Sequence, residues 1–282
     1  FLVGVRRRIK APGSDRGPRT VVFAGRKAYL ANYFSDTLTV IDLAAPDGPV
    51  VSVPLQTPPA MDVVRQGEAL FNDATLCFQG WQSCASCHSA DARVDGFNWD
   101  LLNDGIGNPK NAKSLVFAHQ TPPSMWRGVR ADAGVAVRAG IRFSMFTVQP
   151  ETHALAIDEY LQSLDPQPSP HLVQGKLSPA AQRGQQLFLA KSTGCAECHP
   201  PRLFTDTKSY DVGTRGPRDQ PTEQFDTPTL IELWRSAPFL HDGSAVTLHD
   251  VLTSRNRDGR HGRTSDLKPK EIDDLVIYLL SL

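Results

Sequence analysis

The chain has 282 residues, and its 30 Lys and Arg balance 30 Asp and Glu, so the formal net charge is zero. This balance argues against a nucleic-acid binder and against a protein that docks on membranes through a basic surface, because both need an excess of positive charge. Hydrophobic residues make up 40% of the chain, which favours packed domains over disorder, and no apolar run approaches the ~18 residues of a membrane span.

The N-terminal part of the chain has the composition of short β-strands. It starts at Phe1 without Met and without a signal-peptide pattern, so we expect a processed chain or a fragment. Residues 21–33 and 37–43 are rich in β-branched and aromatic residues with turns between them. We therefore predict a β segment over residues 1–57, and its pattern resembles one blade of a YVTN-type β-propeller. A propeller closes only with about 4–8 blades, so this segment needs either further blades upstream or packing against the rest of the chain.

Two Cys-x-x-Cys-His motifs follow, at residues 84–88 and 195–199. This is the attachment pattern of haem c, in which two thiols add to the vinyl groups of the porphyrin and the adjacent His offers its imidazole to the iron. The sequence therefore predicts two covalently attached haem c groups, haem 1 and haem 2. Because such haems are attached outside the cytosol, we expect a periplasmic, extracellular or cell-surface protein. The predicted attachment and proximal residues are Cys84, Cys87, His88, Cys195, Cys198 and His199.

Zinc ribbons and redox dithiols also use Cys-x-x-Cys pairs. A zinc ribbon usually places its two pairs about 15–20 residues apart, whereas the pairs that start at Cys84 and Cys195 lie far apart in the chain. A redox dithiol requires neither the adjacent His nor a second copy. The remaining cysteine, Cys77, stands in an apolar segment, and we expect it to be a buried, inert thiol.

The haem motifs lie in an internal repeat, which predicts the architecture. In each half an amphipathic helix precedes the haem loop, at residues 65–71 and 183–188, and a second helix closes the half, at residues 156–164 and 272–282. The Pro-rich residues 165–170 between the halves are typical of a stiff, extended linker.

The fold class follows from these elements. We predict a mainly α protein with two cytochrome c-like haem domains in tandem, behind the short N-terminal β segment. The predicted domains are residues 1–57 for the β segment, residues 58–168 for haem 1 and residues 169–282 for haem 2.

The two haem domains resemble the bacterial dihaem cytochrome c peroxidase and MauG family. The most specific part of the resemblance is residues 225–230 followed by residues 237–243 and 247–248, a stretch that the family places beside the second haem. The resemblance implies two haem domains packed together with a Ca²⁺ ion at their interface, and oxygen ligands suit this ion. The matching ligands here are the side chain of Asn111 and the carbonyls of Ser236 and Pro238.

Further positions follow from the same resemblance. The family places a Trp between the haems as an electron relay, and Trp126 matches that position; a buried core Trp is the alternative interpretation. The acid/base Glu of the family would lie near Glu151. Two positions differ from the family, since Arg255 stands where the second haem usually has Met, or Tyr in MauG, and the switchable distal His of the peroxidases falls near Asn103.

The sixth iron ligands are expected from the loops before the closing helices. His261 occupies such a loop in the second half and Met145 occupies a similar place in the first half, so they are the first choices for haem 2 and haem 1. Met145 has core packing as its alternative role, and His119 is the rival ligand for haem 1. If neither binds, haem 1 is five-coordinate and open to a small ligand such as peroxide.

Two functions remain open at this point. The first is electron transfer by a dihaem c-type cytochrome, with a small cytochrome or a cupredoxin as the partner and with a homodimer or a larger redox assembly as expected contexts. The alternative is an enzyme, either a peroxidase that reduces hydrogen peroxide or a MauG-like oxidase, which uses an open haem 1 and an acid/base group such as Glu151. A third interpretation gives the N-terminal β segment a role in docking onto a partner.

Overall fold

The computed structural model describes residues 9–57, 60–100 and 107–282, and the chain divides into two compact units, Phe1–Arg65 and Gln66–Leu282. Both Cys-x-x-Cys-His motifs lie in the second unit, whose boundary falls eight residues after the predicted domain boundary at residue 57. Among the described residues, no helix combines the length and the apolar character that crossing a bilayer requires.

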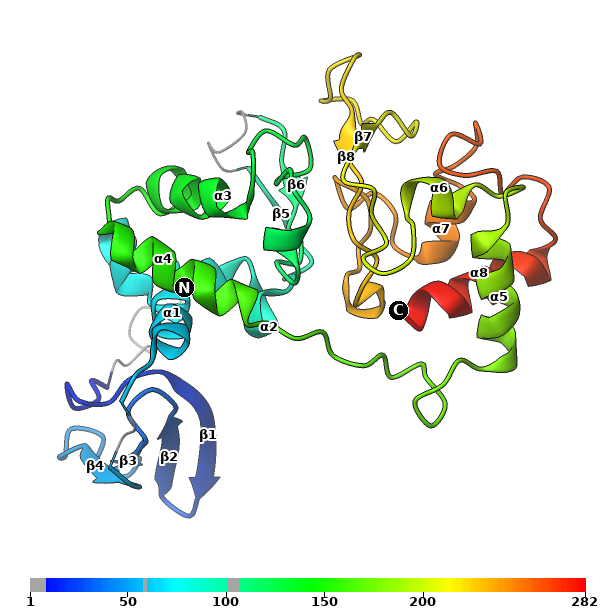
Figure 1. The fold of residues 1–282 in the computed structure, drawn as a ribbon. Coiled ribbons are helices and arrows are strands. Elements are labelled where there is room, and N and C mark those ends of the chain that lie inside the picture. Colours follow the sequence, from blue (N-terminus) through cyan, green and yellow to red (C-terminus); the bar gives the residue numbers. More distant parts are fainter. Residues whose placement is uncertain (1–8, 58–59, 101–106) are drawn as a thin grey trace. The chain divides into compact units, whose positions relative to one another are not determined.

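The first unit is a four-stranded antiparallel sheet in the order β1-β2-β3-β4 (Figure 1). The prediction of strands in this segment is confirmed, whereas its assignment to a propeller stays a prediction. A buried polar cluster supports the sheet, because the side-chain amide of Asn32 donates to the hydroxyls of Thr37 and Thr39 at 3.0 and 2.7 Å. The unit extends to Arg65, whose guanidinium donates to the carbonyl of Tyr33 at 2.7 Å. The strands are β1 (Pro18–Ala24), β2 (Lys27–Asn32), β3 (Thr37–Asp42) and β4 (Val51–Pro54).

The second unit repeats one helical arrangement twice, as the sequence repeat predicts. In the first half, α1 packs against α4, and in the second half α5 packs against α8. The rings of Phe71 and Tyr160 contact each other at a steep angle with centroids 5.4 Å apart, and Phe188 and Tyr278 repeat that contact at 5.4 Å. These four helices confirm the predicted amphipathic segments, with bounds α1 (Val63–Asn72), α4 (Glu151–Gln162), α5 (Pro179–Leu189) and α8 (Pro269–Leu280).

A glycine at each helix crossing makes the close packing sterically feasible. A Cβ atom on Gly67 would lie 1.8 Å from the carbonyl oxygen of Ala156, and one on Gly184 would lie 2.0 Å from the carbonyl oxygen of Asp274. Any larger residue at either position would therefore push the two helices apart.

Shorter elements hold the haem loops and the walls around them. Two small antiparallel pairs, β5 with β6 and β7 with β8, occupy corresponding places in the two halves. Side-chain caps fix the helix starts, since Asp132 accepts from the backbone N–H of Val135 and Ser178 accepts from that of Ala181. The remaining elements are α2 (Ser89–Ala92), β5 (Asn98–Trp99), β6 (Lys110–Asn111), α3 (Ala133–Ala139), α6 (Cys195–Cys198), β7 (Ser209–Tyr210), β8 (Phe225–Asp226) and α7 (Leu248–Leu252).

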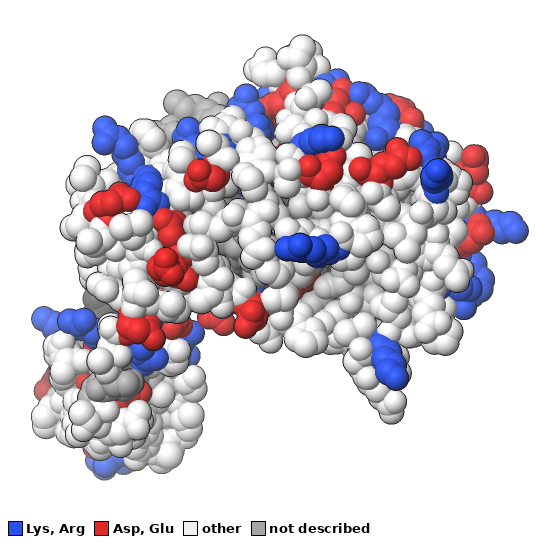
Figure 2. Space-filling view, viewed as in Figure 1, with Lys and Arg blue, Asp and Glu red and all other residues white. Residues whose placement is uncertain are grey.

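A buried ion pair joins the two haem halves. The guanidinium of Arg93 donates from Nε and Nη2 to the two carboxylate oxygens of Glu232, at 2.9 Å each, and Nη2 also donates to the carbonyl of Asp165 at 2.9 Å. Arg93 is 4% exposed and Glu232 is fully buried. On the surface, by contrast, basic and acidic side chains lie interspersed over the face in Figure 2.

Candidate haem sites

The first haem motif forms a tight turn that directs His88 inward. Cys84–Ser86 is a 3₁₀ turn, and the backbone N–H of His88 donates to the carbonyl of Cys84 at 2.9 Å. The ring atom Nδ1 of His88 lies 2.9 Å from the carbonyl oxygen of Lys113. A metal-binding His usually donates its second ring N–H to such a carbonyl, which fixes the tautomer and leaves Nε2 for the metal. Burial lowers the pKa of His88, which favours the neutral imidazole that iron requires.

The second haem motif repeats this geometry. Cys195 and Cys198 start and end the single helical turn α6, and Nδ1 of His199 lies 2.8 Å from the carbonyl oxygen of Phe204. Burial also lowers the pKa of His199. In both motifs burial favours the neutral imidazole, and Nδ1 lies within hydrogen-bond distance of a backbone carbonyl.

None of the four motif cysteines forms a disulfide. Burial raises the pKa of Cys84 to about 12 and that of Cys87 to about 11, and it also raises the pKa values of Cys195 and Cys198. A redox dithiol needs a lowered pKa, so this environment argues against that alternative. In the part of the chain that the structure describes, no group of three His, Cys, Asp or Glu side chains could hold a metal ion, which also argues against a zinc ribbon.

Both motifs open into one continuous cavity of about 450 Å³ within the second unit. Its walls are mainly apolar, as suits a porphyrin, and they come from both halves. The residues present fit two haem c groups, because the thiols that would form the thioethers and the imidazoles that would bind iron share this cavity. The six lining residues concerned are Cys84, Cys87, His88, Cys195, Cys198 and His199.

His261 faces His199 across the second haem site. Their ring centroids are 6.4 Å apart with an interplanar angle of 41°. Metal–imidazole bonds are about 2.0–2.1 Å long, so two axial imidazoles on one metal have centroids roughly 6 Å apart. Burial, followed by the nearby His199, lowers the pKa of His261 to about 4, so this ring is neutral as well. Asn256 holds the loop, because its Oδ1 accepts from the backbone N–H of His261 at 2.9 Å and its Nδ2 donates to the carbonyl of Gly262 at 2.8 Å.

The distal candidates for haem 1 are placed differently. Met145 lines the cavity and is 3% exposed, but its sulfur lies 3.8 Å from Sγ of Cys84. A thioether sulfur lies at the periphery of a porphyrin, whereas an axial ligand lies over its centre. The ring of His119 turns to Asp158, with 3.1 Å between Nε2 and Oδ1, while its neighbour Ala118 lines the cavity. Asn103 lies outside the described residues.

The structure does not bring Glu151 to the cavity. Its carboxylate lies on the first turn of α4, is 63% exposed and pairs with the guanidinium of Arg138. Glu151, the position matched by resemblance, therefore does not place an acid/base group beside haem 1. The reason is local, since a helix N-terminus favours an exposed acidic residue whatever the cavity requires.

Trp126 lines the cavity into which both motifs open. Its indole Nε1 donates to the carbonyl of Asn111 at 2.7 Å, and its own carbonyl accepts from the backbone N–H of Asp226 at 2.8 Å. The ammonium of Lys113 lies 5.1 Å from the Trp126 ring centroid and 2.6 Å from a carboxylate oxygen of Asp226. Sequence reasoning missed Lys113, which stands in no motif, and it gave no role to Asp226, although this residue lies in the stretch 225–230.

The three residues matched to a calcium site also meet at the cavity. Asn111, Ser236 and Pro238 all line it, and the side-chain Nδ2 of Asn111 lies 3.3 Å from the carbonyl oxygen of Pro238. The backbone N–H of Asn111 donates to the carbonyl of His241 at 2.8 Å. The amide oxygen and nitrogen of Asn exchange places by a half turn of the side chain, so this position can present oxygen to a cation.

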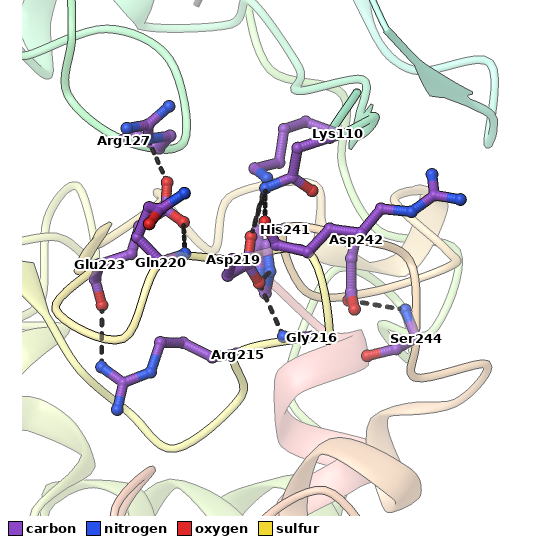
Figure 3. Close-up of polar contacts among 12 residues, drawn as sticks. Lys110, Arg127, Arg215, Gly216, Asp219, Gln220, Glu223, His241, Asp242 and Ser244 are labelled. Carbon is purple, nitrogen blue, oxygen red and sulfur yellow. Dashed lines mark hydrogen bonds and ion pairs between the residues drawn. The ribbon is translucent and has the colours of Figure 1, made fainter. Parts of the chain in front are cut away.

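A buried polar network adjoins that position (Figure 3). Nε2 of His241 lies 2.7 Å from Asp219, and Nζ of Lys110 lies 3.0 Å from the same carboxylate. Burial opposes ionisation of Asp219, but hydrogen bonds from Asn108, the backbone N–H of Gly216, Lys110 and His241 outweigh it and hold the pKa of Asp219 well below its usual range. The His241 ring also stacks on Phe225, with centroids 3.7 Å apart.

Comparison with known proteins agrees with this geometry. Residues 62–168 match the family described as di-haem cytochrome c peroxidase, and residues 181–282 match the family described as cytochrome c. The chain is 33% identical over 275 residues to hydrazine synthase subunit gamma of Kuenenia stuttgartiensis, covering 78% of this chain and 78% of that protein. It is 24% identical over 286 residues to the methylamine utilization protein MauG of Methylophilus methylotrophus, covering 82% of this chain and 85% of that protein.

A solved structure shows the same similarity. The structure of Kuenenia stuttgartiensis hydrazine synthase pressurized with xenon matches with a TM-score of 0.73 and 31% identity, covering 80% of this chain and 89% of that chain. These matches, together with two Cys-x-x-Cys-His loops in one cavity, imply covalently bound haem c. The chain belongs to the dihaem cytochrome c peroxidase and MauG family.

Proposed function

We propose that this chain is a dihaem electron-transfer protein whose two haem sites have different roles. Haem c supplies one-electron redox chemistry at its iron. The observation that carries the proposal is the pair of rings of His199 and His261, which face each other with centroids 6.4 Å apart. His199 and His261 would hold the iron of haem 2, and imidazole ligation would give it a lower potential than Met ligation.

At the haem 1 site, His88 would bind the iron from one face of the haem. The facing wall along α3 presents apolar residues to the cavity, among them Ala133, Ala136 and Val137. The contact between Met145 and Cys84 supports a place at the porphyrin edge. We therefore infer that haem 1 has an open face for a small molecule, and that Trp126 lies on the electron path between the sites.

Peroxide reduction is the second candidate function. The open face of haem 1 favours it, because a peroxidase needs a free iron position. It also needs an acid/base group, and Glu151 is an exposed partner of Arg138 instead. The described residues therefore support electron transfer better than peroxidase activity.

The relative named hydrazine synthase subunit gamma supports a wider context. We infer that this chain also works as one subunit of a larger redox assembly, outside the cytosol, and exchanges electrons with a small cytochrome or a cupredoxin. Hydrazine, a small nitrogen compound, then joins hydrogen peroxide as a probe of haem 1.

The ferric holo-protein tests the proposal by absorption and electron paramagnetic resonance spectroscopy. We expect one low-spin and one high-spin haem, with only the high-spin signal changing when hydrogen peroxide or hydrazine is added. Met145→Leu should leave both signals unchanged. Two low-spin haems in the wild type, with one converted by Met145→Leu, would overturn the open haem 1.

A further inference from the structure

A second pocket, of about 610 Å³, adjoins the cavity beside haem 2. Two loops form it, residues 212–215 and residues 254–258 with Arg260. Among its described lining residues, four are arginines and one is acidic, Asp258. The arginines are Arg215, Arg255, Arg257 and Arg260.

Two of these arginines lack an ion-pair partner. Arg215 donates to Asp211 at 2.7 Å and to the carbonyl of Glu223 at 3.3 Å, the second contact being visible in Figure 3. Arg260 also pairs with Asp211. Arg255 and Arg257 are exposed, and within the described part of the chain no acidic side chain pairs with either. The pocket therefore carries uncompensated positive charge on guanidinium groups, which bind oxyanions and carboxylates in a bidentate manner.

The pocket wall is also the loop that presents His261. Arg260 precedes His261 and lines both the pocket and the haem cavity. The side chain of Asn256 closes this loop on itself through the backbone N–H of His261 and the carbonyl of Gly262. The opposite loop touches Arg260 closely, since a Cβ on Gly213 would lie 3.2 Å from Cδ of Arg260.

We propose that this pocket binds a small oxyanion or carboxylate from solution, held by the arginines of both loops. The concave shape favours a small anion over an acidic protein surface, because arginines of both loops line one pocket. A bound anion would tie the two loops together behind His261. It would also place negative charge near haem 2, which stabilises the oxidised form and lowers the midpoint potential; this second consequence rests on the proposed function.

Isothermal titration calorimetry of the holo-protein with inorganic phosphate, at constant ionic strength, tests the site. We expect saturable binding in the wild type and binding weaker by about tenfold or more in the Arg255→Gln/Arg257→Gln double variant, since two charge-assisted contacts are lost. Lys176→Gln removes an exposed positive charge outside the pocket, and it should bind phosphate as the wild type does. Absence of saturable binding, or equal binding by wild type and double variant, would overturn the site.

Spectroelectrochemistry tests the coupling separately. Phosphate should lower the midpoint potential of haem 2 in the wild type and leave that of the double variant unchanged. Phosphate binding without any change of potential would overturn the coupling to haem 2 while the site stands. The haem content of each variant, measured as the pyridine haemochrome, separates these outcomes from a failure of the chain to carry two haems.

Discussion

The imidazole rings of His199 and His261 lie in the same cavity with centroids 6.4 Å apart and an interplanar angle of 41°. The ring of His199 is anchored to the carbonyl of Phe204 through Nδ1, whereas the backbone N–H of His261 donates to the side chain of Asn256 and so fixes the loop that carries the second ring. Two neutral imidazoles at this separation match the demands of one iron ion with two axial nitrogens.

Replacement of His261 by Ala should therefore convert haem 2 from low spin to high spin. The loss of one strong axial ligand weakens the ligand field while the thioether links and His199 keep the haem in place. Absorption spectroscopy of the ferric protein measures the change. His171→Ala is the matched control, because His171 is exposed, and an unchanged spectrum of His261→Ala would reject this residue as the ligand.

The crossing of α5 and α8 should not tolerate a side chain at Gly184. A Cβ there would lie 2.0 Å from the carbonyl oxygen of Asp274, so Gly184→Ala should lower the free energy of unfolding by about 3 kcal/mol through overpacking. Urea unfolding of the holo-protein, followed by circular dichroism, measures this value. Gln186→Ala lies exposed on the same helix and should stay within about 0.5 kcal/mol of the wild type. Equal stability of the two variants would contradict a tight crossing.

Loss of the buried ion pair between Arg93 and Glu232 should also destabilise the protein. Arg93→Leu leaves the buried carboxylate without its main partner, and we expect a loss of about 3–5 kcal/mol in the free energy of unfolding. Arg235→Leu is the control, because its guanidinium lies 3.8 Å from Glu232 and is 25% exposed; its effect should be about 1 kcal/mol or less.

The same pair predicts a pH dependence. Burial opposes ionisation of Glu232, but hydrogen bonds from Arg93 and from the backbone N–H of Gln167 outweigh it and lower the pKa of Glu232 below its ordinary value of 4.5. A carboxyl group with a lowered pKa contributes its stability above the ordinary value and loses it as the pH falls through the folded value. The difference in stability between wild type and Arg93→Leu should therefore shrink on acidification below about pH 4.5. A difference that stays constant with pH would contradict this assignment.

Removal of calcium tests the oxygen site at Asn111, Ser236 and Pro238. Treatment with EGTA should lower the unfolding temperature of the wild type by several degrees, because a ligand that binds only the folded state stabilises it. Asn111→Ala should unfold at the same temperature with and without EGTA. A wild-type protein that contains no calcium by atomic emission and does not respond to EGTA would reject the site.

Local patterns predicted the repeated parts of this molecule well. The two haem loops follow from cysteine spacing, and the helices that contain Gly67 and Gly184 follow from hydrophobic periodicity. His261 was accessible as a candidate because it stands in the loop before a closing helix, and the structure brings it opposite His199.

Long-range polar contacts could not be predicted in the same way. Asp219 meets Lys110 and His241 only after the chain has folded, and no spacing rule connects residues so far apart in sequence. Glu151 shows a different difficulty. Its role was assigned by alignment with the family, and an alignment shifted by a few residues names the wrong side chain. In the structure the Glu151 carboxylate pairs with Arg138 instead.

The contacts that hold Trp126 have a consequence for the rate of the proposed electron transfer. Its indole is fixed to Asn111, its backbone to Asp226, and the Lys113 ammonium is held between its ring and the Asp226 carboxylate. On the proposed electron path through Trp126, these contacts would hold the distance between the two haem sites constant, and tunnelling rates fall exponentially with that distance. Mutations that remove these contacts should therefore widen the spread of electron-transfer times before they change either haem site.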